Sequence, residues 1–514
     1  MSPAPEVNWR SFGSEDCLRE SLEFESPPLQ RIDDTISQLR YIERYASELS
    51  CGSIAIESPY IDRDYIEDHS AFYSKNLFPY PNSCRRIHFF KGDVGDVIAA
   101  LKDAVEIGQR DGIDAYRAAC LNVSRDHYLG FCVIKPLNGT PVGRTVMKCY
   151  SAEPDDKSYK RHFTCTKKYV THFAGCELSV TGLAFQQQDI GVSACATTAL
   201  WSALQKTADA EPIAAMTPVQ ITQLATQYSL PSGRPMPSEG LDVGQMCNAV
   251  QASGVSPNLF RVVKNHEQAR YILRSAILSG FAPVLAIQNE QGVGHAVVAV
   301  GLKEQGIHDP ADVHFHQHTV KGLYIHDDRL GPNLRCTYHV PEEKKASLGF
   351  EIGLRGNGAI EAWELLYILV PMHPKIRLSF ADIEKIASSL MTRILSIHSL
   401  VSKTAEKPIP QHPIGFDIRI LRAHRYIERL ICDSNGVDAG HIERISNKVA
   451  PARYLAVIRV SGPFFSEFDV VIDSTGTITN PNFLAVVPIQ SAPNGLRLMG
   501  RFLAEKVLDC PFVD

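Results

Sequence analysis

The sequence predicts an α+β fold, in which helices and antiparallel strands occupy separate runs of the chain. Apolar residues first recur at helical spacing, and short apolar runs bounded by glycine and proline then follow, as expected of buried strands. The expected helices cover 195–204, 217–228, 240–250 and 266–279, and the expected strands cover 280–287, 295–300 and 322–327. At 514 residues the chain exceeds what one core usually holds, so we expect several domains.

The pattern along the chain predicts a flexible arm followed by three domains. Residues 1–30 are polar and rich in proline, which predicts an extended arm. Residues 31–155 mix helical spacing with strand-like runs and predict an N-terminal α+β domain. Residues 176–372 hold the helices and strands given above. Residues 375–514 begin after a pair of prolines and predict a C-terminal α+β domain.

One element of the C-terminal domain carries a basic stripe. Residues 416–432 are expected to form an amphipathic helix that bears Arg419, Arg422, Arg425 and Arg429. A stripe of this kind usually forms a solvated face with salt bridges.

Composition excludes several classes of function. The chain carries a net charge of −5 and a pI near 6.4, which argues against a nucleic-acid partner. The sequence shows neither an apolar run long enough to span a bilayer nor a secretory signal, so we expect no membrane partner. The 13 cysteines are scattered without C-x-x-C pairs, which favours reduced thiols and a cytoplasmic protein.

Cys195 stands at the expected start of a helix. Ser193 is placed to cap that helix, and apolar residues recur behind Cys195 at helical spacing. Helix N-termini stabilise anions and lower thiol pKa values, and the thiolate is the reactive form. The plainer interpretation is a small buried apolar side chain, which is the commoner role of a free cysteine.

His295 stands at the mouth of an expected buried strand, where it can reach a cleft. The following strand ends in Asp327 and Asp328, and a carboxylate of this kind orients and stabilises a catalytic imidazole. Because side chains alternate along a strand, we expect only one of the two to meet His295. The alternative roles are a strand-end histidine bonded to a carbonyl and an aspartate that caps a turn.

The order Cys195, His295, Asp resembles a papain-like cysteine peptidase. Gly294–Gly301 is similar to the histidine strand of that family, and Asp328-Arg-Leu-Gly331 falls where the family carries Asn-Ser-Trp-Gly. The match to the orienting Asn favours Asp328, whereas resemblance to the Asp-Pro turn of the bacteriocin-processing branch favours Asp327. The resemblance implies a papain-like core, flanked here by the N-terminal and C-terminal α+β lobes.

The resemblance also implies a glutamine that helps to bind the oxyanion. Gln188 lies one residue further from Cys195 than the family spacing, and Asp189 occupies the matching position. A one-residue bulge would make Gln188 the donor, which we favour.

The function that follows is an intracellular thiol hydrolase, a cysteine peptidase acting on a protein or peptide. The same residues would serve a deamidase or an acyl or glutaminyl transferase, and an inactive binding or regulatory module is the third alternative. The flanking lobes are available to bind a regulatory protein. We expect no cofactor and no metal, since His314, His316 and His318 lack a completing carboxylate or thiol and favour a solvated hairpin.

Overall fold

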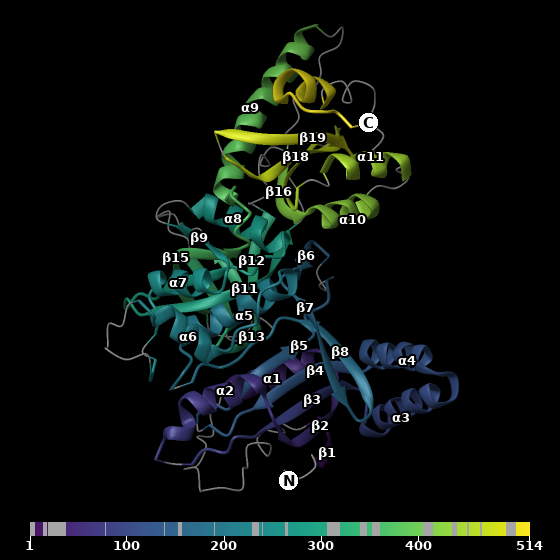
Figure 1. Cartoon of the computed structure of the whole chain (residues 1–514), viewed down its shortest axis with the longest axis vertical. Coiled ribbons are helices and arrows are strands. Elements are labelled where there is room, and N and C mark those ends of the chain that lie inside the picture. The colour runs from purple at the N-terminus through teal and green to yellow at the C-terminus, as the bar shows by residue number, and fades with distance from the viewer. Residues whose placement is uncertain are drawn as a thin grey trace.

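The computed structural model stacks three tiers along the long axis of the molecule, in chain order from bottom to top (Figure 1). The fold is mixed α and β, and every ladder between its described strands is antiparallel, as the sequence predicts. The structure describes residues 6–513 except 14–17, 19–36, 78, 138, 153–156, 190, 229–235, 239, 263–265, 306–318, 340–346, 352–359, 405–414, 434–438, 450–451, 463–464, 478 and 490–499.

The lowest tier is a five-stranded sheet in the order β1-β2-β3-β4-β5. Its strands are β1 (Glu6–Ser11), β2 (Cys51–Tyr60), β3 (Cys84–Lys91), β4 (Tyr128–Ile134) and β5 (Val142–Met147), and its helices are α1 (Ser37–Glu48), α2 (Arg63–Ala71), α3 (Val94–Asp111) and α4 (Ile113–Asp126). The flexible arm predicted for residues 1–30 is wrong in part, because β1 pairs with β2 along its whole length. Trp9 of β1 packs on Phe90 and Phe173, which gives this segment an apolar contact.

The middle tier begins with short strands and four helices. β6 (Tyr159–His162) pairs with a later strand, whereas β7 (Lys167–Phe173) and β8 (Cys176–Gly182) form a hairpin that packs on α4, β4 and β5 of the lowest tier (Figure 1). The helices are α5 (Cys195–Ala210), α6 (Pro218–Thr226), α7 (Val243–Ala252) and α8 (His266–Leu278). Thr217 and Asp242 each form a capping box, so α6 and α7 begin close to where the sequence predicts.

A six-stranded barrel completes the middle tier. Its strands pair in order from β10 to β15, and β15 pairs back onto β10 to close the ring. They are β10 (Val284–Gln288), β11 (Gly294–Gln305), β12 (Val320–Asp327), β13 (Gly331–His339), β14 (Ser347–Glu351) and β15 (Ile360–Met372), with β9 (Ser256–Arg261) added beside β15. Helix α5 packs against β11, which brings the first turn of the helix near the first residues of the strand.

The upper tier is a four-stranded sheet in the order β16-β17-β18-β19 with three α-helices and a short π-helix (Leu503–Leu508). The strands are β16 (Gly415–Arg422), β17 (Tyr454–Gly462), β18 (Phe465–Thr477) and β19 (Asn480–Pro488), and the helices are α9 (Phe380–Thr404), α10 (Ala423–Asp433) and α11 (Ala439–Val449). The single helix predicted for residues 416–432 is wrong: its first half is β16 and only its second half is α10.

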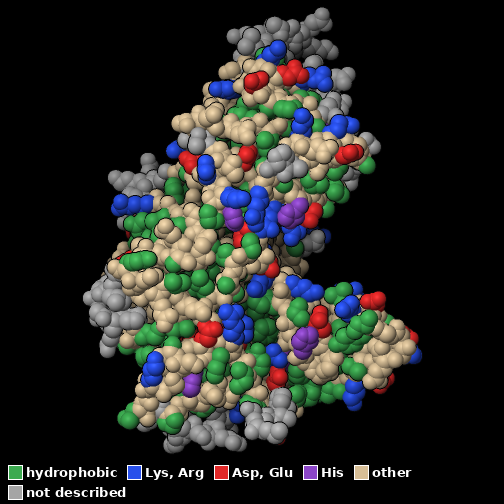
Figure 2. Space-filling view, viewed as in Figure 1, with side chains coloured by type: hydrophobic (Ala, Val, Ile, Leu, Met, Phe, Trp, Pro, Cys, Tyr) green, Lys and Arg blue, Asp and Glu red, His purple; other side chains and the backbone are tan. Residues whose placement is uncertain are grey.

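Ion pairs join the upper tier to the middle tier. Glu211, which follows α5, lies 2.9 Å from Arg422 and 3.0 Å from Arg453, and Arg274 of α8 lies 2.7 Å from Asp417. At this level the visible face of the molecule carries a group of Lys, Arg and His side chains (Figure 2).

Candidate active site

Cys195 is the first residue of α5, at the helix end whose backbone N–H groups lack partners within the helix. Its side chain is half-buried, and Ala194 is the N-cap residue. The cap predicted at Ser193 is wrong, because the Ser193 hydroxyl donates a hydrogen bond to Asp189 at 3.0 Å instead. The sulfur nevertheless lies where the helix dipole stabilises an anion.

The loop that leads into α5 is folded around the buried carboxylate of Asp189. Its Oδ1 accepts hydrogen bonds from the backbone N–H groups of Gly191, Val192 and Ser193 at 2.9, 2.6 and 3.1 Å. The Nζ of Lys135, directly after β4, lies 3.7 Å from its Oδ2. Burial alone would raise the pKa of Asp189, but Lys135 and the backbone donors lower it. Asp189 is therefore a charged residue that shapes the loop.

The three consecutive glutamines before this loop have different environments. Gln188 is half-buried and lines the same cleft as Cys195. Gln187 is buried and bonds the turn between β4 and β5, whereas Gln186 is buried with no hydrogen-bond partner for its Nε2 among the described residues. Of the three, Gln188 is the one that faces the cleft, which is the residue that the sequence analysis favours.

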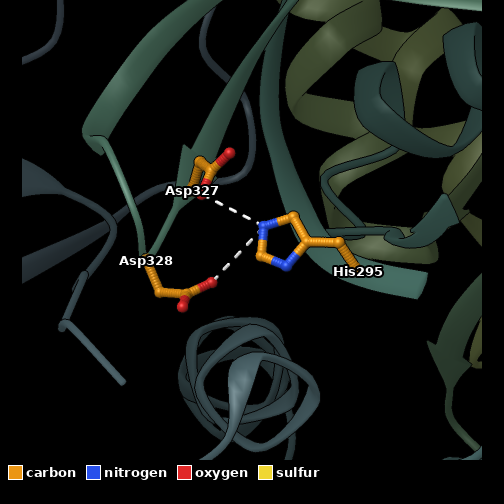
Figure 3. Close-up of side chains that lie close together, drawn as sticks. All are labelled: His295, Asp327 and Asp328. Carbon is orange, nitrogen blue, oxygen red and sulfur yellow. Dashed lines mark hydrogen bonds and ion pairs between the residues drawn. The ribbon is translucent and has the colours of Figure 1, made fainter. Parts of the chain in front are cut away.

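His295 is the second residue of β11, and its imidazole is buried beside both Cys195 and Asp327. Its Nε2 lies 3.1 Å from Asp327 Oδ1, and the other ring nitrogen points away from the carboxylates (Figure 3). Burial alone would lower the pKa of His295, but hydrogen bonds to Asp327 and to Cys195 raise it to about 10. These two contacts favour the protonated form of the imidazole.

Both carboxylates predicted to compete for His295 approach it. Asp328 Oδ1 lies 3.6 Å from the same Nε2 that Asp327 contacts at 3.1 Å (Figure 3). The expectation that only one could meet the imidazole is wrong, because the β12–β13 register shifts between Ile325 and Asp327 and strand alternation ends there. Asp327, the match to the Asp-Pro turn, makes the shorter contact, whereas the match to the orienting Asn, which the sequence analysis favours slightly, is Asp328.

The two carboxylates differ in charge. Burial opposes ionisation of Asp327, but His295 and Arg329 lower its pKa below the usual range. Burial raises the pKa of Asp328 to about 7, and the neighbouring charge of Asp327 adds to this rise against the pull of His295. Neither side-chain oxygen of Asp328 has a hydrogen-bond partner within the described parts of the chain. Asp327 is thus the fixed anion, and Asp328 titrates near neutrality.

Arg329, Glu361 and Trp363 complete this cluster, and the sequence analysis missed all three. The Arg329 Nη2 lies 2.9 Å from Asp327 Oδ2 and 3.2 Å from Glu361 Oε2, and the guanidinium stacks on Trp363 at 4.8 Å. The Trp363 ring centroid is also 5.6 Å from that of His295. An arginine beside two aspartates is a visible signal in the sequence, but its partners on β15 are not.

A metal ion is the other chemistry that this donor set suggests. His295, Asp327 and Asp328 offer ligand atoms that lie within 4.8 Å of one another. Arg329 Nε, however, lies 3.2 Å from His295 Nε2, so a bound dication would face a guanidinium at the same atoms. We therefore assign these side chains to proton chemistry. His314, His316 and His318 lie outside the described residues.

Comparisons with known proteins give no independent assignment. No protein-family model matches this sequence. A search of curated proteins likewise finds no match. Among the helices that the structure describes, none has the length and apolar character needed to cross a membrane.

Proposed function

We propose that this protein is a thiol hydrolase with a papain-like core, and specifically a cysteine peptidase that acts on a protein or peptide. The observation that carries the proposal is the position of His295, whose Nε2 lies 3.1 Å from Asp327 Oδ1 and whose pKa is raised in part by the neighbouring Cys195 thiol. A protonated imidazole beside a thiol at a helix N-terminus favours the nucleophilic thiolate.

The chemistry then follows in two steps. The Cys195 thiolate attacks the substrate carbonyl, and His295 gives its proton to the leaving amine. A water molecule, deprotonated by His295, attacks the thioester and releases the acid and the thiol. The developing oxyanion would meet the Gln188 amide and the backbone N–H of Cys195, since both border the cleft. Asp327 holds the imidazole in orientation.

The thiols support a reducing compartment for this protein. Every described cysteine is a free thiol, and most of them are buried. We therefore propose a cytoplasmic location, where thiols stay reduced.

The test of the nucleophile is labelling with iodoacetamide near pH 7, with the adducts located by mass spectrometry. We expect Cys195 to react at least tenfold faster than Cys247, which is also half-buried but has no imidazole partner among the described contacts. His295→Ala should abolish that advantage, whereas His266→Ala serves as the control. Equal labelling of Cys195 and Cys247 in the native protein would contradict the proposal.

The acyl acceptor needs a separate measurement. Intact-mass spectra of candidate peptides should show two cleavage products if the protein is a peptidase. A gain of one mass unit without cleavage would instead identify a deamidase, and joining to an added amine would identify a transferase.

A further inference from the structure

Helix α1 of the lowest tier packs against β13 of the barrel, where the two tiers meet (Figure 1). Tyr45 Oη accepts a hydrogen bond from Asn333 Nδ2 at 3.0 Å, and Glu48 lies 3.1 Å from Arg335. The residues of α1 that make the contact recur at helical spacing and share one face of the helix: Gln38, Tyr41, Tyr45 and Glu48. The start of this face lies beside the turn between β12 and β13, which carries the two aspartates of the candidate active site.

The turn from Asp327 to Gly331 is bonded directly to α1. Gln38 Nε2 donates a hydrogen bond to the backbone carbonyl of Asp328 at 3.1 Å, and both residues are buried. The Tyr41 ring packs so closely on Gly331 that a Cβ atom added to this glycine would lie 2.2 Å from Tyr41 Cδ1. The lowest tier therefore contacts the turn both near its start and at its end.

The same turn directs the Asp327 carboxylate. Its Oδ1, which lies 3.1 Å from His295 Nε2, also accepts a hydrogen bond from the backbone N–H of Arg329 at 2.9 Å. The Asp328 carbonyl and the Arg329 N–H belong to one planar peptide group. Gln38 therefore holds one side of this peptide group, and the Asp327 carboxylate is bonded to its other side.

We propose that Gln38 is a positioning residue of the candidate active site, which keeps the Asp327 carboxylate directed at His295 by holding this peptide group. The inference rests on the proposed function and extends the site into the lowest tier. Without the Gln38 amide, a buried carbonyl loses its donor, which favours rotation of the peptide group toward another donor. That rotation would take the Arg329 N–H away from Asp327 and release the carboxylate.

The ionisable groups around His295 set the direction of the expected change. They are Cys195 on α5, Asp327 and Asp328 at the end of β12, and Arg329, which lies beside Glu361 of β15. Burial lowers the pKa of His295, and the hydrogen bond with Asp327 is the largest of the contacts that raise it. A displaced carboxylate therefore favours the neutral imidazole, and less thiolate then forms at a given pH.

The test compares Gln38→Met with Glu48→Gln. Gln38→Met keeps the length of the side chain and removes the amide donor, whereas Glu48→Gln weakens the contact with Arg335 at the other end of α1. We expect Gln38→Met to slow iodoacetamide labelling of Cys195 at pH 7 by about fivefold or more, and to move the rise of labelling with pH toward higher pH. Glu48→Gln should leave the rate within about twofold, even where it lowers the melting temperature as much as Gln38→Met does.

Amide hydrogen exchange measures the turn without reference to the thiol. The backbone N–H of Arg329 should exchange about tenfold faster or more in Gln38→Met than in the native protein, because its peptide group is released. Glu48→Gln should leave this exchange rate unchanged. Gln38→Asn, whose amide is carried on a side chain one methylene shorter, should shift labelling and exchange in the same direction by a smaller amount, and it provides both measurements if Gln38→Met does not fold.

The outcomes separate this inference from the proposed function. Selective labelling of Cys195 in the native protein that is unchanged in both Gln38 variants would overturn the positioning role and leave the proposed function standing. Equal slowing of labelling in Glu48→Gln at an equal loss of melting temperature would also overturn that role, since reactivity would then follow stability alone. Loss of selective labelling in the native protein would overturn both.

Discussion

Asp327 and Asp328 are neighbours in sequence and lie beside the same imidazole nitrogen, yet they differ in charge. Arg329 balances Asp327 at 2.9 Å, whereas the oxygens of Asp328 have no hydrogen-bond partner among the described residues. A carboxylate without donors is costly to ionise when buried, so Asp328 keeps a proton until the pH approaches 7. Asp327 alone is therefore a permanent counter-charge for His295.

This difference predicts unequal effects of the two amide variants. Asp327→Asn should lower hydrolysis, or iodoacetamide labelling of Cys195 at pH 7, by about a hundredfold or more, because a buried counter-charge and orienting acceptor is lost. Asp328→Asn should stay within about tenfold, since it replaces a group that is already about half protonated at that pH. A larger loss in Asp328→Asn than in Asp327→Asn would assign the orienting role to the other residue.

The raised pKa of Asp328 also predicts how the stability of the protein depends on pH. Its pKa is about 7 in the folded protein, against about 3.9 in an unfolded chain. The folded state therefore holds a proton that the unfolded state loses, so this stabilisation is complete below about pH 4 and is lost as the pH rises through 7. Asp328→Asn should remove this loss, which amounts to up to about 4 kcal/mol.

Urea denaturation at pH 5 and pH 8 measures this effect. The free energy of unfolding of the native protein should fall between the two values more steeply than that of Asp328→Asn. Parallel curves for the two proteins would show that another group carries the pH dependence.

At the scale of elements, the loop before α5 is the segment that positions Cys195 at the start of the helix. The resemblance to papain-like enzymes assigns a glutamine to the position of Asp189, and the aspartate instead binds consecutive backbone N–H groups. The sequence could predict a helix at Cys195 because helical spacing is local. It could not predict the loop, since Lys135 lies on another tier.

Asp189→Ala should therefore damage both stability and reactivity. The variant leaves buried N–H groups and the ammonium of Lys135 without their acceptor, at a cost of about 3–5 kcal/mol in the free energy of unfolding. Cys195 labelling should slow as the loop loses its order. Asp189→Asn, which keeps an acceptor oxygen, should retain more of both properties. In thermal melts and in Cys195 labelling rates, the native protein should rank highest, Asp189→Asn second and Asp189→Ala lowest.

The segment 416–432 shows where local pattern misled the sequence analysis. Arginines at helical spacing predicted a solvated face, but residues 416–420 also alternate apolar and polar side chains, which is the period of a strand. In β16 this alternation buries Phe416, Ile418 and Ile420. Arg419 lies 3.0 Å from the buried Asp417 instead of forming part of a solvated helical face.

At the scale of the whole molecule, the ion pairs of Asp417 join the upper tier to the middle tier. It lies 2.7 Å from Arg274 of the middle tier and 3.3 Å from Arg429, in addition to Arg419. Asp417→Ala removes the buried counter-charge that these three guanidinium groups share and should cost about 3–5 kcal/mol in the free energy of unfolding. Arg425→Ala, at an exposed ion pair, should cost less than about 1 kcal/mol.

Pulsed thiol labelling in urea shows which tier of Asp417→Ala loses stability. Cys510 is buried in the upper tier and Cys336 is buried in the barrel. In Asp417→Ala, Cys510 should become reactive at a lower urea concentration than Cys336. Simultaneous exposure of both thiols at the native midpoint would contradict a role for Asp417 in holding the upper tier.

The sequence predicts features that depend on neighbouring residues, and it does not predict contacts between segments far apart in the chain. Cys195 at a helix start and His295 at a strand start depend on neighbours in the chain, and both placements are confirmed. The β12–β13 register shift that brings both aspartates to His295 depends on a partner strand. The contact of Arg329 with Trp363 depends on barrel closure.

Closure of the barrel by β15 has a consequence for the moment at which the site matures during synthesis. Cys195 and His295 leave the ribosome early, but β15 (Ile360–Met372), which pairs with β10 and supplies Glu361 and Trp363, follows later. A nascent chain that ends before β15 holds Cys195 and His295 without the strand that completes their surroundings. The order of the chain therefore places Glu361 beside Arg329, and Trp363 beside His295, only after β15 has been made and the ring has closed.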